Sequence, residues 1–507
     1  MSAESFSLLT LAITSHSGEI ANRVCARSLV VKDSSSTPTS GSLGMAFGWT
    51  TGILDIVPLP IQLSLNSWSR RADSPHGRLM TTAQQARPSA PTSAPTAQSA
   101  PPRSLVRDQA FRLLFTAAAV SKLGSAVGSL AIPLVAVSAL HASPGQVGLL
   151  ATLGTLSFLV VGLPAGAWVD RMRKRRLMIT ADLVRTVVLA SVPITWALGH
   201  LTIHQLYAVV LLCGTATVFF DVASLSHLPD LVGRDRLTEA NAHLVTADAL
   251  TQVGGRGAGG FLLSVVGAPA AVAVDAVSYL WSAACLLRVR RAERIRECRA
   301  DTNLAQEVRE GLRFVFGDPM LRSIALAGAF TNLSIQLCQT LLPVLFTREL
   351  GLPDWALGLF FAVGGLGIFL GSLCARRLAH RFGAGRVLWM MGLAVAPFGL
   401  PVALVDRGPA LWLAAVAWLV TTFKVGIDNV LKVSFRQALT PDAMLGRMNA
   451  TMRFVLTGAL CAGSAIAGLL GQFVGVRAAL LVGAAGLAVV WVPIFFSPLR
   501  TTRDLPK

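Results

Sequence analysis

The fold is decided by the stretch Gly166-Ala-Trp-Val-Asp170-Arg171-Met-Arg-Lys-Arg175-Arg176, which separates an apolar run at 147–169 from another at 177–198. About twenty apolar residues in a helix cover the hydrocarbon core of a bilayer. Within hydrocarbon, only a helix or a closed barrel satisfies every backbone N–H and C=O group. The stretch therefore predicts a short basic loop between two transmembrane helices.

The same pattern recurs on both sides of this loop, from Leu113 to Phe496. We place twelve spans at approximately 113–138, 147–169, 177–198, 203–223, 243–265, 269–288, 323–346, 355–376, 387–405, 409–430, 451–474 and 478–497. The composition agrees, since 53% of the 507 residues are hydrophobic and 14% are charged, whereas soluble domains carry about a quarter charged residues. The sequence predicts an all-α membrane protein.

The positive charge of the chain is concentrated in alternate connectors. The connectors 141–146, 200–205 and 267–269 contain no Lys or Arg, whereas 171–176 and 288–322 are crowded with them. Because cytoplasmic loops of membrane proteins are enriched in Lys and Arg, we expect both termini to be cytoplasmic. The net charge of +18 is thereby explained by topology, without nucleic-acid binding.

The long connector divides the spans six and six, and the two sets share a plan. The eighth span ends in Gly371-Ser-Leu-Cys-Ala375-Arg376-Arg377, with Gly and Arg placed as they are around the second span. Such internal repetition is typical of transporters built from two related bundles. We predict an N-terminal bundle at 106–288, a basic cytoplasmic linker at 289–322, a C-terminal bundle at 323–498 and a cytoplasmic tail at 499–507.

The first 105 residues are expected to lie outside this fold. The segment from Pro88 to Pro102 consists mainly of Pro, Ala, Ser, Thr and Gln, a composition that buries too little apolar area to offset the entropy of ordering. We predict a disordered extension, and one interpretation is that translation begins at Met80.

Motifs of enzymatic and metal chemistry are missing from the sequence. None of the seven Cys residues forms a pair with metal-ligand or redox spacing. We find no phosphate-cradling loop, no zinc-protease motif and no nucleophile elbow. We therefore expect no cofactor, no metal and no enzymatic activity, and any active transport would draw on a gradient.

In these features the chain resembles the major facilitator superfamily, in the branch of drug and siderophore exporters that includes macrolide-efflux and enterobactin-exporter proteins. The resemblance covers about Arg112 to Arg500 and is strongest at the loop from Gly166 to Arg176. It is supported by Phe219-Phe220-Asp221, Leu228-Pro229-Asp230-Leu231-Val232, Asp275-Ala-Val-Ser278-Tyr279, Glu310-Gly311-Leu312-Arg313-Phe314 and Pro441-Asp442 with Gly446-Arg447. It implies two bundles that export a small molecule by alternating access.

The loop motif predicts a gate. Gly166 would let a neighbouring helix approach closely, and Asp170 can pair with Arg171 or Arg175 while facing a helix N-terminus across the bundle interface. The alternative is that the cations, with Arg176, only hold topology. An acid at Asp170 favours the gate, because the positive-inside rule does not require one.

The fifth span resembles the antiporter motif of exporters, with an arginine where that family usually has proline. Its defining positions are Gly255, Arg256, Gly259 and Gly260. An arginine in mid-span costs at least ~2.5 kcal/mol on insertion scales, so it needs a partner or water. Asp248 and Gln252 precede Arg256 at a four-residue spacing, so Gln252 can bridge the charges. Arg256 is then a proton or substrate element, a satisfied ion pair, or an inactivating change.

Several polar residues are candidates for contact with substrate or protons. Lys122, in the first span, is either a site residue or a cation that snorkels or pairs with Asp248. Asp428 lies between Lys424 and Lys432 at four-residue spacing, which predicts local neutralisation. The resemblance implies that the first, fourth, seventh and tenth helices line the cavity, which brings forward Lys122, Asp221, Asn332, Gln336, Gln339 and Asp428. The three amides could instead form interhelical hydrogen bonds.

We therefore expect a monomeric secondary transporter, with several passes through the cytoplasmic membrane, that exports a small amphipathic molecule. Protons are the expected coupling ion, with Asp221, Asp248 or Asp428 as acceptor. The alternatives are an importer or uniporter of the same fold, or a membrane sensor or scaffold that transports nothing. Export rather than uptake rests on the resemblance alone.

Overall fold

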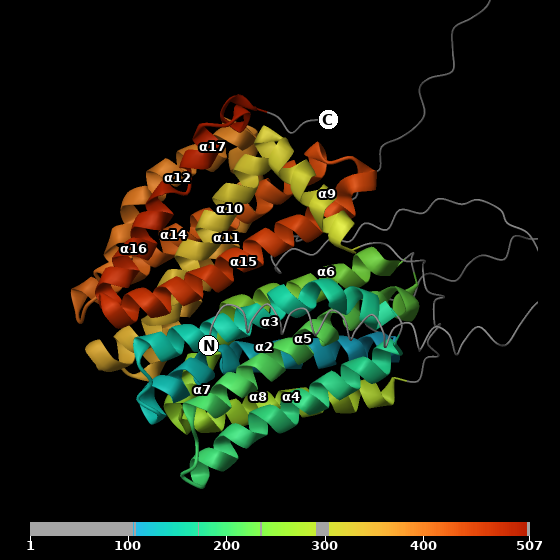
Figure 1. Ribbon diagram of the computed structural model, residues 1–507, viewed down its shortest axis with the longest axis vertical. Helices are drawn as coiled ribbons and strands as arrows, with labels where there is room; N and C mark the ends of the chain where they lie inside the picture. The colour runs from blue at the N-terminus through green and yellow to red at the C-terminus, as the bar shows by residue number, and fades with distance from the viewer. Residues whose placement is uncertain (1–104, 106–107, 171, 234–235, 290–303, 504–507) are drawn as a thin grey trace, which may run out of the picture. The chain divides into compact units, whose positions relative to one another are not determined.

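The computed structural model describes residues 105, 108–170, 172–233, 236–289 and 304–503 (Figure 1), all of which belong to one unit of the chain. Throughout these residues the regular secondary structure is helical. The predicted extension before residue 105 and the possible start at Met80 lie outside the described residues, as does Arg171.

The first half of the structure begins where Asp108 caps a helix, its carboxylate accepting a hydrogen bond from the backbone of Ala110 at 2.9 Å. Glycines with positive φ end two of its helices, at Gly233 and Gly267. The elements are α2 (Gln109–Leu134), η2 (Val135–Ala139), α3 (Pro144–Asp170), α4 (Lys174–Ala197), α5 (Ile203–Val232), α6 (Leu237–Leu250), η4 (Thr251–Gly255), α7 (Arg256–Val266) and α8 (Ala268–Arg288).

The second half follows a short amphipathic helix, α9 (Leu304–Gly317), in the described part of the predicted linker. Asp318 caps the next helix by accepting hydrogen bonds from the backbones of Met320 and Leu321. The remaining elements are α10 (Pro319–Val344), η5 (Leu345–Glu349), α11 (Asp354–Phe382), α12 (Ala384–Val395), η6 (Ala396–Phe398), α13 (Gly399–Ala403), α14 (Pro409–Leu439), η7 (Asp442–Met444), α15 (Leu445–Phe473), α16 (Val476–Val489), α17 (Val492–Phe495) and η8 (Pro498–Thr501).

The membrane spans agree with the sequence prediction. Within the described residues, 11 helices are long and apolar enough to cross a bilayer. The predicted fifth span, 243–265, is divided into α6, η4 and α7 by a π-helical turn at Thr251–Gly255. Two consecutive glycines in this turn weaken the α-helical hydrogen-bond pattern, and π turns of this kind recur at functional sites.

Small residues bring neighbouring helices together within each half. A Cβ atom added to Gly371 of α11 would lie 1.9 Å from the carbonyl oxygen of Phe423 in α14, and one on Gly367 would lie 2.2 Å from the Thr422 hydroxyl. Such backbone contact requires glycine, and it is how membrane helices gain packing energy without a hydrophobic driving force.

The hydrophobic core joins the two halves at one end of the structure only. One cluster combines residues beside the cation-poor connectors of both halves, such as Leu134, Val272, Leu341 and Phe360. Beside the basic connectors the core falls into separate clusters, one confined to residues 105–289 and two to residues 315–499. We call these the joined end and the split end.

Two glycine pairs seal the joined end. A Cβ on Gly148 of α3 would lie 2.2 Å from the Cα of Gly468 in α15, and one on Gly260 of α7 would lie 2.5 Å from the Cα of Gly358 in α11. The amide of Gly145 also donates to Oε1 of Gln472 at 3.2 Å. The halves therefore meet through α3 with α15 and through α7 with α11.

Candidate substrate and gating site

A pair of opposite charges lies between α2 and α6. Lys122 Nζ forms an ion pair with Asp248 Oδ1, with side-chain exposures of 49% and 14%. The structure thus selects the pairing with Asp248 among the possibilities for Lys122. The partner that the sequence suggested for Asp248, Gln252, has a side chain outside the described part of the structure.

Asp221 of α5 extends this group of charges across the two halves. Its partly buried carboxylate is attracted electrostatically by three cations and repelled by one carboxylate. The cations are Lys122, Arg185 and Arg453, and the carboxylate is that of Asp248. Arg453 belongs to α15 in the second half, and the negative charge of Asp221 attracts its guanidinium. Candidate residues of the first, fourth and fifth predicted spans are therefore brought into one electrostatic cluster with a cation of the second half.

Arg256, the first residue of α7, lies where the halves meet. Its guanidinium carbon is 5.5 Å from the ring centroid of Phe361 in α11, and in the described part of the chain no carboxylate forms an ion pair with it. A cation–π contact stabilises by about 0.5–2 kcal/mol, less than the ~2.5 kcal/mol cost of a mid-span arginine. The satisfied ion pair considered from the sequence is therefore not formed among the described residues.

The glycines of the same motif pack helices against one another. A Cβ on Gly255 would lie 2.9 Å from the Cβ of Ala126 in α2, and one on Gly259 would lie 3.2 Å from the Cα of Val127. With Gly260 against Gly358, the motif holds α7 between α2 and α11. This close packing is the role that glycine plays in membrane helices.

The loop motif anchors structure within the first half. Arg175 donates from Nε to the carbonyl of Leu286 at 2.8 Å and from Nη2 to that of Leu287 at 2.7 Å. These carbonyls end α8, where a cation also complements the helix dipole. Arg176 is exposed, and the Asp170 side chain lies outside the described residues.

The close approach predicted at Gly166 is not made in this conformation. No heavy atom among the described residues of other elements lies within 4 Å of the position of a Cβ at Gly166. Gly166 is near the split end, where the halves have separate cores, so a helix of the second half is not packed against it.

A cation of the same loop has a partner that the sequence analysis missed. Lys174 is 8% exposed, and its Nζ donates to the carbonyl of Ser226 at 2.8 Å and to Asp230 Oδ2 at 3.3 Å. The signal was available, since Asp230 belongs to a motif that supported the family resemblance.

The candidate residues of the second half form hydrogen bonds and ion pairs within that half. Asn332 of α10 donates to the carbonyl of Leu456 in α15 at 3.1 Å, which is the interhelical bond considered as an alternative. Gln336 donates to Thr340 of its own helix at 3.4 Å, and Gln339 is partly buried. Asp428 is 2% exposed, paired with Lys424 and 2.9 Å from Lys432, as the spacing predicted.

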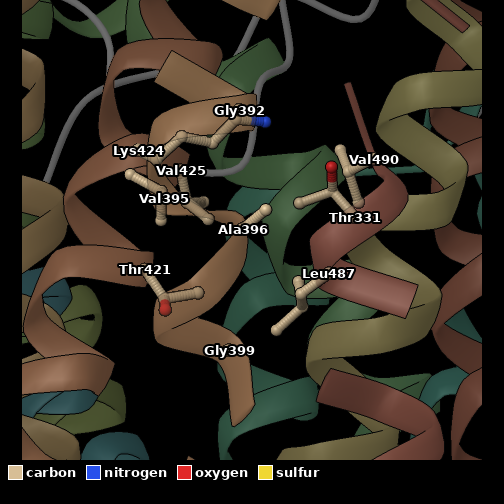
Figure 2. Close-up of a pocket in the computed structure, with 10 residues that line it drawn as sticks. All are labelled: Thr331, Gly392, Val395, Ala396, Gly399, Thr421, Lys424, Val425, Leu487 and Val490. Atoms are coloured by element: carbon tan, nitrogen blue, oxygen red, sulfur yellow. The ribbon is translucent and has the colours of Figure 1, made fainter. Parts of the chain in front are cut away.

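Lys424 also lines a small cavity inside the second half. The cavity has a volume of about 20 Å³, and Thr331, Thr421 and Lys424 supply its polar side chains. Figure 2 shows these residues among the apolar side chains and glycines that complete the lining. Its volume admits about one water molecule, so this cavity is too small to hold a transported compound.

Two further buried charges were missed from the sequence, although both lie within the predicted span 177–198. Arg185 forms an ion pair with Asp182, and its guanidinium carbon lies 4.6 Å from the ring centroid of Phe220 and 4.1 Å from that of Tyr279. Ionisable residues inside a span warrant a functional hypothesis. Their position in an otherwise apolar run was the signal.

Comparison with known proteins places this geometry in context. The family model for the transmembrane secretion effector family matches residues 100–506. The chain is 27% identical over 411 residues to the multidrug efflux pump Tap of Mycolicibacterium fortuitum, covering 78% of this chain and 97% of that protein. It is 26% identical over 402 residues to the enterobactin exporter EntS of Salmonella typhi, covering 78% and 94%.

Solved structures show the same fold. A bacterial homologue of the iron transporter ferroportin, in an inward-facing state, matches with a TM-score of 0.63 at 17% identity over 78% of this chain and 99% of that one. The nucleoside transporter NupG matches with a TM-score of 0.60 at 12% identity over 76% and 99%. At these identities the likeness concerns the fold alone.

Proposed function

The chain belongs to the transmembrane secretion effector family of the major facilitator superfamily, and from this premise we propose that it exports a small amphipathic molecule in exchange for protons. It is a multi-pass membrane transporter of small molecules, a kind of protein distinct from enzymes. The proposal adds the direction of transport, the coupling ion, the class of substrate and a location in the plasma membrane with cytoplasmic termini.

The observation that carries the proposal is the one-sided contact between the halves. They share a hydrophobic core at the joined end and have separate cores at the split end. By the positive-inside rule the split end, with its basic connectors, faces the cytoplasm. The conformation is then the inward-facing state of an alternating-access cycle, in which rocking of the halves would exchange the two ends.

The charges between the halves support coupling to protons. Lys122 forms an ion pair with Asp248, and Asp221 interacts electrostatically with Lys122 and Arg453, so two carboxylates are influenced by cations of both halves. Because a carboxylate binds a cation only while it is ionised, protonation of either acid would weaken its pairing and change the contact between helices. Asp428 is less suited to this role, since two lysines hold it within its own helix.

The test is accumulation of a panel of fluorescent dyes and antibiotics in cells that express the full chain, with and without a protonophore. Lower accumulation that is lost on uncoupling supports proton-driven export, and an Asp170→Asn variant tests the gate in the same assay. Accumulation above that of control cells would overturn export and favour uptake by the same fold.

A further inference from the structure

A buried group of charges lies inside the first half, and it adjoins the cluster between the halves because Arg185 also interacts electrostatically with Asp221. Asp182 is 0% exposed, Arg185 2% and Asp275 3%. Asp182 and Arg185 come from α4 and Asp275 comes from α8, so the group bridges two helices. Two carboxylates here accompany a single guanidinium.

The guanidinium of Arg185 is paired with the carboxylate of Asp182. Its Nη2 forms an ion pair with Asp182 Oδ1, and the rings of Phe220 and Tyr279 flank its guanidinium. Thr217 Oγ1 lies 3.5 Å from Nη1. The buried cation therefore has one carboxylate in direct contact, and the aromatic faces leave little room for a second.

Asp275 has weaker partners. Ser278 Oγ lies 3.4 Å from its Oδ1. Among the described residues, Arg185 is the only cation that attracts this carboxylate electrostatically. Other polar groups near the site are Ser282 of α8, which interacts with Asp182, Tyr279, whose hydroxyl lies 2.7 Å from Ser125 Oγ of α2, and the Cys213 thiol of α5, which interacts electrostatically with Asp275 and Arg185. Nothing among these groups neutralises a second negative charge.

The packing of α2 leaves little room for water beside this charge. A Cβ on Gly124 would lie 2.8 Å from Asp275 Oδ1, and one on Gly128 would lie 2.1 Å from Oδ2. The carboxyl group is thus pressed against the backbone of α2. In addition, Asp182 Oδ2 is buried without a hydrogen bond among the described residues.

A buried carboxylate that lacks a paired cation becomes neutral by binding a proton. From the two carboxylates, the single guanidinium, which is paired with Asp182, and the close packing of α2, we infer that Asp275 holds a bound proton in this conformation and is a proton-carrying residue of the transporter, in addition to the acids between the halves. The step transfers one proton from a hydronium ion to a carboxylate oxygen of Asp275, so that one O–H bond of the hydronium breaks, one O–H bond forms on the carboxyl group, and a water molecule is released. The assignment of this proton to coupling rests on the proposed function, whereas its presence on Asp275 does not.

Helix α2 connects the proton on Asp275 to the ion pair of Lys122 and Asp248. Release of the proton would leave a net negative charge against Gly124 and Gly128, which is tolerated only if α2 moves away and admits water. Lys122 belongs to the same helix and pairs with Asp248 of α6. Movement of α2 would therefore transmit loss of the proton to the charges between the halves.

Infrared spectroscopy of the purified full chain in lipid vesicles tests the occupancy directly. Titrated from about pH 5 to about pH 9, the wild type should show the C=O stretch of a buried carboxylic acid, and Asp275→Asn should lack it. Asp182→Asn should lack it as well, because Arg185 is then free to pair with Asp275. Asp248→Asn, the matched control outside the group, should retain it.

A signal that persists unchanged in Asp275→Asn would overturn the inference, as would a wild type without any carboxylic acid signal. If Asp275→Asn fails to fold, as judged by circular dichroism, the comparison of Asp182→Asn with Asp248→Asn decides between the same outcomes.

Transport then separates this inference from the proposed function. The probe is ethidium. Asp275→Asn should still exchange ethidium down its concentration gradient, but the ethidium concentration ratio that the proton gradient maintains across the membrane should fall at least about tenfold. Full proton-driven export by Asp275→Asn would overturn the coupling role and leave the proposed function standing. If the wild type shows no proton-driven export of any compound, the proposed function fails, and the infrared signal alone decides whether Asp275 holds the proton.

Discussion

Gly148 of α3 and Gly468 of α15 meet so closely that a Cβ atom on Gly148 would lie 2.2 Å from the Cα of Gly468. The two residues are far apart in sequence and belong to different halves of the transporter. With the matching contact between Gly260 and Gly358, they define the joined end, and a side chain at either position would push the halves apart.

Gly468→Leu should open the contact between α3 and α15. Cys461 is a native reporter, since its Sγ lies 3.9 Å from the carbonyl of Thr152 across the same contact. We expect its alkylation by N-ethylmaleimide, followed by mass spectrometry, to accelerate about tenfold, equivalent to ~1.4 kcal/mol. Gly458→Leu is the control, because the nearest atom to its Cβ is 3.8 Å away. Equal rates in both variants would show that the glycine pair does not hold this end closed.

Lys122 and Asp248 should be energetically coupled. Because Lys122 is half exposed, solvent weakens the pair, and interhelical polar pairs in membranes average about 0.6 kcal/mol. We expect Lys122→Met and Asp248→Asn each to lower stability and the double variant to lower it by less than their sum. The measurement is a double-mutant cycle from unfolding in mixed micelles. Strict additivity would mean that the pair makes no net contribution.

Arg175 should contribute structure beyond its charge. Its two bonds to the carbonyls of Leu286 and Leu287 require the planar guanidinium, and bonds to charged groups are each worth about 1.5–3 kcal/mol. Arg175→Lys preserves the positive charge that sets topology, yet we expect it to lose about 1–2 kcal/mol of stability.

The exposed neighbour Arg176 supplies the comparison for that experiment. Arg176→Lys should leave thermal unfolding in detergent unchanged, since surface substitutions usually stay within about 0.5 kcal/mol. If both substitutions were neutral, the cations of this loop would hold topology alone.

Arg256 is expected to destabilise the protein that carries it. Its cation–π contact with Phe361 offsets only part of the ~2.5 kcal/mol insertion cost. We therefore predict that Arg256→Leu raises stability by about 1 kcal/mol and changes transport, whereas Phe361→Leu lowers stability. Thermal unfolding and dye export, measured together, test this. Lower stability in Arg256→Leu would indicate a stronger partner for the arginine.

The relation between sequence and site differs from residue to residue. The spacing of Lys424, Asp428 and Lys432 predicted their pairing, because all three lie on one helix. Lys122 and Asp248 were considered as a pair, but only the structure brings them together. For Arg256 the sequence suggested Gln252 and Asp248, and the described contact is Phe361 in the other half. Local periodicity cannot predict which face of a helix meets a distant one.

By itself the sequence predicted twelve apolar spans in two sets of six and showed the alternation of basic connectors, because each helix satisfies its own backbone in hydrocarbon whatever surrounds it. The described residues form 11 helices of this kind, and the predicted fifth span is divided by a π-helical turn. Only the tertiary structure decided that the halves join beside the cation-poor connectors, where Gly148 meets Gly468. It also decided that Asp275 is enclosed with Arg185 and Asp182. These relationships depend on how helices rotate and pack, which small residues and buried charges from distant segments settle together.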